Sequence, residues 1–219
     1  PFHEAAEHPW CAGLALQSGT VLGELRALEE HAGPQLWDGL RAGEHGLSPM
    51  GAEWRCIRMA KHGCWLSSVG FPKTEAVFRS LRGARLNEVF LARMPPRTRI
   101  LPHSDSTNFL LTAHVGLELE GGMAALTVGE CTREWSEGGV LVFDHSYIHS
   151  ATNDSDRDRY VLGCRFWHPG CSDEEAYALS FMSILLECLM RQGRVANVAM
   201  LPNHFAHVTD QCTVEMANT

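Results

Sequence analysis

A series of short strand-like segments, most of it between residues 85 and 167, constrains the fold of this chain more than any other feature. The segments are rich in β-branched, aliphatic and aromatic residues. The turn-forming pairs Pro95-Pro96 and Gly121-Gly122 separate some of them. The predicted strands are 56–60, 64–69, 85–93, 97–103, 108–119, 123–128, 140–143 and 160–167. So many short strands divided by turns indicate a barrel-like β fold.

Three other segments show the apolar spacing of helices, at 20–31, 72–81 and 172–191. In the last of them Ser172 is a suitable N-cap, and the acidic residues that follow it suit the positive end of the helix dipole. Helices beside short strands predict a mainly β fold: a double-stranded β-helix (jelly roll, cupin-like) core with flanking N- and C-terminal helices.

The composition limits the number of domains and the kinds of partner. With 219 residues, 45% of them hydrophobic, the chain can bury the core of one domain. We expect that single domain over 1–219, with a helical N-terminal buttress at 1–50, the β-helix core at 51–169 and a C-terminal helix and tail at 170–219. The net charge of −8 argues against a nucleic-acid partner. No apolar run has membrane-spanning length, so no membrane partner is expected, and the oligomeric state stays open.

The eight cysteines contain no C-x-x-C pair, so neither a zinc ribbon nor a redox motif is indicated. Free thiols in a reducing compartment are favoured over one or two disulfides, which predicts a cytoplasmic protein. No signal-peptide pattern opens the chain, but it begins at Pro1, and the removal of an earlier targeting segment stays open.

The segment His103-Ser104-Asp105 and the more distant His149 form the candidate metal site. Alternate residues of a strand share a face, so His103 and Asp105 can reach one ion together. His149, 46 residues later, adds a second imidazole from another strand. Two histidines and one carboxylate are typical of non-haem Fe(II) oxygenases. Two alternatives remain: a zinc-dependent hydrolase with the same ligands, and a β-helix module that binds a ligand without catalysis.

An iron oxygenase of this kind needs a second source of electrons, which 2-oxoglutarate supplies. Its distal carboxylate requires a fixed cation, and arginine suits this because its planar fork forms two parallel hydrogen bonds. Arg159, ten residues after His149, opens a predicted strand that returns toward the histidine. Arg157 is a competing candidate on spacing alone.

Several further segments resemble the aspartyl/asparaginyl β-hydroxylase family. The resemblance extends over about residues 85–170. The similar segments are 102–108, 114–117, 132–138, 142–146, His149, Arg159 and 167–169. The resemblance implies an enzyme with a double-stranded β-helix core that uses Fe(II), 2-oxoglutarate and O2. It also implies that His103 and His149 are iron ligands and that Arg159 binds the distal carboxylate of 2-oxoglutarate.

The resemblance places His114 near the proximal carboxylate of 2-oxoglutarate, but two positions depart from the family pattern. Asp105 stands where animal members have glycine, and it restores a full triad. Thr112 stands where the family usually has arginine, which removes a cation from the proximal carboxylate. Arg93 and Arg165 are the candidate replacements.

The resemblance predicts hydroxylation of an unactivated C–H bond, and it leaves the substrate open between an amino acid, a peptidyl residue and another small molecule. The position oxidised, and whether another oxidative outcome replaces hydroxylation, also stay open. Candidate residues near the substrate are Trp54, Trp65, Arg58 and Arg93. For both tryptophans, packing in the core is an equally good interpretation.

Overall fold

The computed structural model describes residues 1–37, 54–66, 70–105 and 107–191. The chain divides into two compact units, Pro1–His168 and Pro169–Thr219. The assignment of all 219 residues to one domain stays a prediction. The predictions for residues 38–50 of the N-terminal buttress, for the end of the strand at 64–69 and for the tail after residue 191 lie outside the described residues.

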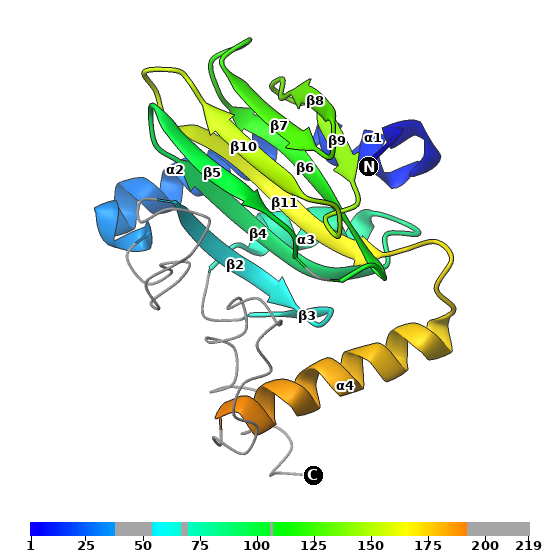
Figure 1. The fold of residues 1–219 in the computed structure, drawn as a ribbon. Coiled ribbons are helices and arrows are strands. Elements are labelled where there is room, and N and C mark those ends of the chain that lie inside the picture. The colour runs from blue at the N-terminus through cyan, green and yellow to red at the C-terminus, as the bar shows by residue number, and fades with distance from the viewer. Residues whose placement is uncertain (38–53, 67–69, 106, 192–219) are drawn as a thin grey trace. The chain divides into compact units, whose positions relative to one another are not determined.

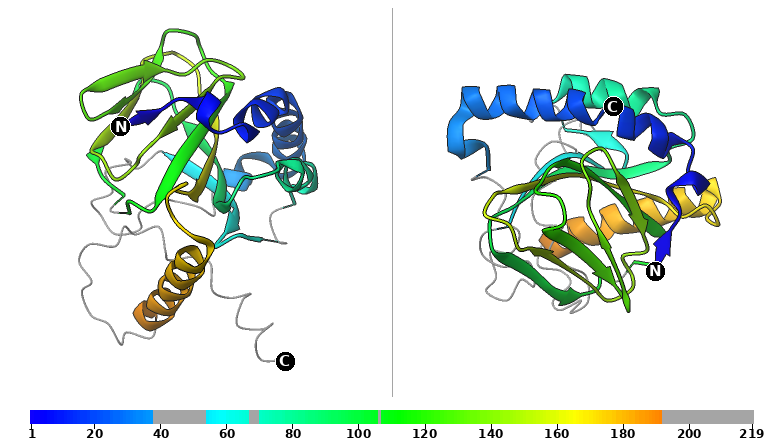
Figure 2. Two further views of the ribbon diagram at one scale, coloured as in Figure 1. Left: turned by 90° about the vertical axis from the view of Figure 1, so that its right-hand side faces the viewer. Right: turned by 90° about the horizontal axis from the view of Figure 1, so that it is seen from above.

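Two antiparallel sheets form most of the first unit (Figure 1). The larger, seven-stranded sheet has the order β1 (Phe2–His3), β9 (Val140–Phe143), β6 (Leu110–Glu118), β11 (Arg159–Trp167), β4 (Leu86–Met94), β2 (Arg55–Lys61) and β3 (Cys64–Trp65). The four-stranded sheet has the order β5 (Thr98–His103), β10 (His149–Asn153), β7 (Ala124–Val128) and β8 (Cys131–Glu134). The sheets face each other as a double-stranded β-helix (Figure 2).

Each face of the larger sheet buries a different hydrophobic cluster, because side chains alternate along a strand. On β4, Phe90 and Ala92 point into the β-helix, where they pack with Ile100 and Leu126 of the smaller sheet. The intervening Leu91 joins the cluster on the outer face, which the helices cover. The inward face of β11 therefore carries Arg159, Val161, Gly163 and Arg165.

The helices α1 (Trp10–Leu16), α2 (Ser18–Ala32) and α3 (Pro72–Ser80) lie along the outer face of the larger sheet (Figure 2). Glu24 of α2 joins two of them. Its carboxylate accepts hydrogen bonds of 2.7 Å from the backbone N–H of Lys73 and of Thr74, and from the Thr74 hydroxyl. A carboxylate on the first N–H groups of a helix satisfies donors that have no intrahelical acceptor. Glu24 thus fixes the start of α3.

The second unit contains α4 (Asp173–Arg191). Ser172 and Glu175 form a reciprocal capping box. The Ser172 hydroxyl accepts the Glu175 N–H at 3.1 Å, and the Glu175 carboxylate accepts the Ser172 N–H at 2.8 Å. Among the described residues, no helix is long and apolar enough to cross a membrane. None of the cysteines among the described residues forms a disulfide.

The mainly β, double-stranded β-helix fold with flanking helices is confirmed, but the predicted elements are incomplete. The sequence prediction lacks α1, β1, β8 and β10. Strand β10 has the sequence His-Ser-Ala-Thr-Asn, which shows no apolar alternation. It forms a strand because it pairs with β5 on one side and β7 on the other. Tertiary pairing therefore decides the conformation of this polar segment.

Gly163 allows the Phe90 ring to lie against the backbone of β11. The two residues are partners in register, and a Cβ added at Gly163 would come within 2.3 Å of the Phe90 ring. Replacing Gly163 with alanine is expected to lower the free energy of unfolding by about 1–3 kcal/mol, because the ring must move inside a packed core. Urea denaturation measures this change.

The matched control is Gly23→Ala in α2, where an added Cβ meets nothing within 4 Å. We expect this control to be neutral or to stabilise by about 0.5–1 kcal/mol. Equal stability of the two variants would contradict the prediction.

Candidate active site

The structure brings His103, Asp105 and His149 together. His103 ends β5, and His149 begins β10 directly opposite it in register. One potential ligand atom of each residue lies within 4.8 Å of those of the other two. His103 Nε2 is 3.8 Å from Asp105 Oδ1, and the two imidazole centroids are 4.2 Å apart. This spacing suits three ligands of one metal ion.

An irregular pairing of β5 and β10 turns His103 toward His149. Ala151 pairs with Ile100, whereas His149 pairs with His103, so three steps on β5 match two steps on β10. Such a bulge reverses the alternation of side chains, so that His103 and Ile100 point inward together. The sequence predicts that His103 and Asp105 lie on one face of a continuous strand, but Asp105 does not continue β5. It lies beyond the end of β5, where its N–H donates to the His145 carbonyl at 3.1 Å.

Backbone carbonyl groups orient both histidine rings. His103 Nδ1 lies 2.8 Å from the Leu101 oxygen, and His149 Nδ1 lies 2.9 Å from the Tyr147 oxygen. A carbonyl only accepts, so each Nδ1 carries the proton and each Nε2 keeps its lone pair. His103 Nε2 is buried and has no hydrogen-bond partner. Burial, more than any nearby charge, lowers the pKa of His149 and keeps it neutral, as metal binding requires.

Asp105 is held by a buried network of charges. Asp105 Oδ2 forms an ion pair with Arg165 Nη2 at 2.5 Å. The other terminal nitrogen of Arg165, Nη1, lies 3.1 Å from Glu88 Oε2. Glu88 in turn pairs with Arg58. Burial alone would lower the pKa of Arg165, but the carboxylates of Asp105 and Glu88 raise it. Arg165 contacts Oδ2 of Asp105, whereas Oδ1 lies 3.8 Å from His103 Nε2.

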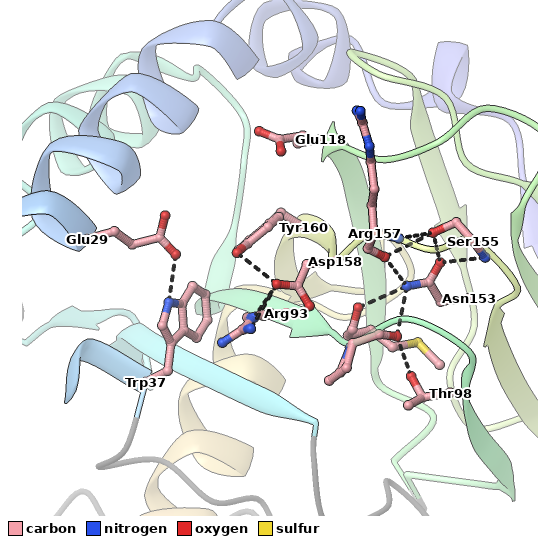
Figure 3. A network of polar contacts seen from close by, with 12 residues as sticks. Glu29, Trp37, Arg93, Thr98, Glu118, Asn153, Ser155, Arg157, Asp158 and Tyr160 are labelled. Atoms are coloured by element: carbon pink, nitrogen blue, oxygen red, sulfur yellow. Dashed lines mark hydrogen bonds and ion pairs between the residues drawn. The ribbon is translucent and has the colours of Figure 1, made fainter. Parts of the chain in front are cut away.

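Thr112 also has a partner that the sequence analysis did not identify. Its hydroxyl lies 2.7 Å from Nδ1 of His145, and the Thr107 hydroxyl lies 2.7 Å from Nε2 of the same ring. His145 is fully buried. The second candidate cation, Arg93, lies on the outer face, where it pairs with Asp158 at 2.8 Å near Tyr160 (Figure 3). In the sequence, His145 is marked only by its place within the segment 142–146, and that place suggests no role for it.

His145 makes the stability of the protein depend on pH. Burial, followed by the charge of Arg165, lowers the pKa of His145 to about 3, whereas an unfolded histidine titrates near about 6.5. Between these values the unfolded state binds more protons, so the free energy of unfolding falls as the pH is lowered from about 6.5 toward 3. Urea denaturation from pH 7 to pH 4 measures the slope. Glutamine does not titrate between these pH values. In His145→Gln we therefore expect the free energy of unfolding to depend on pH less steeply than in the parent, by about 1.4 kcal/mol per pH unit. Parallel profiles for the two proteins would contradict this prediction.

A second group of polar atoms lies in the β-helix around Arg159. Arg159 is 2% exposed, and its guanidinium lies 4.4 Å from the centre of the Trp135 ring. Four buried nitrogens have no hydrogen-bond partner among the described residues: Arg159 Nε, Arg159 Nη1, Trp135 Nε1 and His114 Nδ1. Within the described ranges no carboxylate pairs with Arg159, and burial lowers its pKa to about 9. An unpaired buried cation is costly, so these groups fit an anion that binds between them.

The two groups of residues are neighbours. The Phe143 ring lies 5.1 Å from the His114 ring and 5.6 Å from the His149 ring, measured between centroids. The His114 ring stacks on Trp135 at 6.0 Å. Burial, and next the charge of Arg159, lowers the pKa of His114 well below its usual value. The Phe143 ring therefore contacts both groups in the interior: the possible metal ligands through His149, and the group around Arg159 through His114.

Asn153 fixes the turn that leads into Arg159. Its side-chain nitrogen lies within 2.8–3.0 Å of the carbonyl oxygens of Met94, Pro95 and Arg157 (Figure 3). Arg157, the competing candidate, takes part in this turn through its backbone, and its side chain is exposed. Neither Asn153 nor Trp135 is predicted as a site residue from the sequence, because no spacing marks the role of either.

Comparison with known proteins gives related sequences over the same part of the chain. The sequence model described as aspartyl/asparaginyl beta-hydroxylase matches residues 19–169. The mouse (Mus musculus) aspartyl/asparaginyl beta-hydroxylase is 30% identical over 129 residues, which are 58% of this chain and 17% of that protein. The human (Homo sapiens) aspartate beta-hydroxylase domain-containing protein 2 is 34% identical over 118 residues, 51% of this chain and 32% of that protein. The chain thus spans about a third or less of these two relatives. Among solved structures, a DMSP lyase from Ruegeria pomeroyi is 13% identical with a TM-score of 0.40, over 62% of this chain and 58% of that one.

Proposed function

The chain belongs to the aspartyl/asparaginyl β-hydroxylase family, and from this premise we propose that it is an Fe(II)- and 2-oxoglutarate-dependent dioxygenase that hydroxylates an unactivated C–H bond. One observation carries the proposal: a His-Asp-His triad, with Asp105 and His149 buried, faces the same interior as a buried arginine that no carboxylate of the described residues pairs with. The triad alone would fit several metals. The additional site for an anion is what favours a carboxylate co-substrate.

We propose that His103, Asp105 and His149 hold the iron. Two neutral imidazoles and one carboxylate bind Fe(II) and leave further coordination positions open. The Nε2 atoms are free of protons because Leu101 and Tyr147 accept the proton on Nδ1 of each ring. Arg165 orients Asp105 through their ion pair. Residues around a metal site that act in this way commonly change metal affinity or activity by about 10–100-fold when they are lost.

Arg159 is the proposed partner of the distal carboxylate of 2-oxoglutarate, with Trp135 Nε1 as a neighbouring donor. His114, with its unpartnered Nδ1, is the proposed contact for the proximal carboxylate. Thr112 takes part only indirectly, through His145. A carboxylate bound here would satisfy the buried donors and neutralise the charge of Arg159, so both unfavourable features of the free protein would disappear together.

Together with O2, the bound Fe(II) and 2-oxoglutarate would supply the oxidation, in which the substrate C–H becomes C–OH and 2-oxoglutarate becomes succinate and CO2. The protein contributes orientation and the exclusion of water. The apolar cluster inside the β-helix, which includes Phe90, Met94 and Phe143, surrounds the charged groups and strengthens their interactions. We propose an amino acid, a peptidyl residue or another small molecule as the substrate.

The test is anaerobic reconstitution with Fe(II), followed by titration with 2-oxoglutarate and then exposure to O2. We expect a visible charge-transfer band when 2-oxoglutarate binds, and formation of succinate when O2 is added. Protein loaded with Zn(II) is the matched control, and it should bind 2-oxoglutarate without a band and form no succinate. Absence of the band in protein that has bound iron would reject the co-substrate. If the zinc-loaded protein converted a substrate without consuming 2-oxoglutarate, the protein would instead be a hydrolase.

A further inference from the structure

A second cluster of metal-binding side chains lies at the start of the chain. It consists of His3 at the end of β1, Glu7 in the 3-10 helix Ala5–Glu7, and His8. One potential ligand atom of each residue lies within 4.8 Å of those of the other two. None of these residues belongs to the proposed iron site.

His8 is the unusual member of this cluster. It is 6% exposed, and its buried Nε2 has no hydrogen-bond partner in the part of the chain that the structure describes. Its ring packs edge-on against Phe166 at 5.0 Å, measured between centroids. Burial, and next the neighbouring His3, lowers the pKa of His8, so its ring is neutral. A buried imidazole nitrogen without a hydrogen bond makes folding less favourable, and a metal ion bound to the ring at such a nitrogen would compensate for this cost.

The distances allow a tetrahedral site after small movements of the side chains. His3 Nδ1 and Glu7 Oε2 are 3.9 Å apart. Two ligands about 2.1 Å from one zinc ion lie about 3.4 Å apart at a tetrahedral angle. His168, which follows β11, contacts the His3 ring edge-on with 6.3 Å between centroids. It is therefore near enough to be a candidate for the fourth ligand.

The cluster is separate from the interior of the β-helix. On β1, Phe2 packs with Phe143 in the inner cluster, whereas the next residue, His3, points to the opposite face of the sheet. Phe166, beside His8, likewise belongs to the outer cluster. An ion bound here would link β1 and the following 3-10 helix to the end of β11, and would not reach a substrate at the iron.

We propose that His3, Glu7 and His8, with His168 as the candidate fourth ligand, form a structural Zn²⁺ site on the outer face of the larger sheet. Neutral imidazoles and a carboxylate are ordinary zinc ligands. Four protein ligands would leave no open position, which is typical of structural and not of catalytic zinc sites. The site would hold the N-terminal strand on β9.

Zinc binding to a chain without the iron site tests this proposal. We would replace both His103 and His149 with alanine in the full chain and titrate Zn²⁺ against a chromophoric chelator. One equivalent of zinc is expected to bind. On this background, Glu7→Gln and His3→Asn are each expected to weaken zinc binding at least tenfold. Both positions are more exposed than His8, so these variants avoid the packing of His8 on Phe166, and circular dichroism verifies the fold of each protein.

The matched control is Glu4→Gln, which removes a carboxylate from the same segment but outside the cluster. Its zinc affinity is expected to equal that of the parent. If the parent without the iron site binds no zinc, the proposal is wrong. It is also wrong if either Glu7→Gln or His3→Asn binds zinc as tightly as Glu4→Gln, because binding would then come from scattered surface groups. Since both histidines of the proposed iron site are absent throughout, this result is independent of the proposed oxygenase activity.

Discussion

Replacing His149 with alanine is expected to lower 2-oxoglutarate-dependent turnover by more than about 100-fold. Loss even of a residue that only supports a metal ligand commonly costs about 10–100-fold in metal affinity or activity, and His149 is proposed as a ligand itself. The remaining His103 and Asp105 would hold iron with two side chains, 3.8 Å apart at Nε2 and Oδ1. Formation of succinate and retention of iron after gel filtration measure the two effects.

His31→Ala is the matched control for this experiment. His31 lies in the last turn of α2 and is exposed, so its loss should change neither iron content nor turnover. Circular dichroism and urea denaturation separate the loss of a ligand from the loss of the fold. A folded His149→Ala protein that retains iron and forms succinate at the parent rate would remove His149 from the site.

Replacing Arg159 with alanine is expected to raise the concentration of 2-oxoglutarate needed for half-saturation by about 10- to 150-fold. A buried hydrogen bond to a charged group contributes about 1.5–3 kcal/mol, and about 1.4 kcal/mol corresponds to a factor of ten. Iron binding should change little, because Arg159 contacts none of the three proposed ligands. The charge-transfer band, titrated anaerobically, reports the affinity for 2-oxoglutarate directly.

Arg157→Ala is the control, because that residue lies two positions away, has the same charge and is exposed. Its backbone contacts with Asn153 and Ser155 remain in the variant. Arg159→Lys should bind 2-oxoglutarate with an affinity between those of the parent and the alanine variant, since lysine keeps the charge but not the planar fork. If Arg157→Ala weakens 2-oxoglutarate binding and Arg159→Ala does not, the two roles must be exchanged.

The sequence predicted the triad because its signal is local and chemical. His103 and Asp105 are two residues apart, and a second histidine follows at a distance that a returning strand can cover. The path of the backbone was not predictable in the same way. Strand β10 is polar and is defined by its two neighbours, and the bulge that aligns His103 with His149 leaves no mark in the composition.

The partners of the candidate arginines depend on contacts between distant strands, which sequence spacing does not reveal. Arg165 contacts Asp105, 60 residues away, and Arg93 contacts Asp158, 65 residues away. Trp135 likewise reaches Arg159 only through the folding of the β8 region over the interior.

The orientation of the two histidine rings depends on main-chain atoms, and this separates two properties of the protein. The carbonyl groups of Leu101 and Tyr147 accept the ring protons, while the side chains of these residues are 61% and 47% exposed. Any amino acid supplies the same carbonyl group. The side chains nearest these acceptors can therefore change, during evolution or by design, without a change in the protonation of the imidazoles. The geometry of the proposed metal ligands can then be inherited unchanged while these exposed side chains vary.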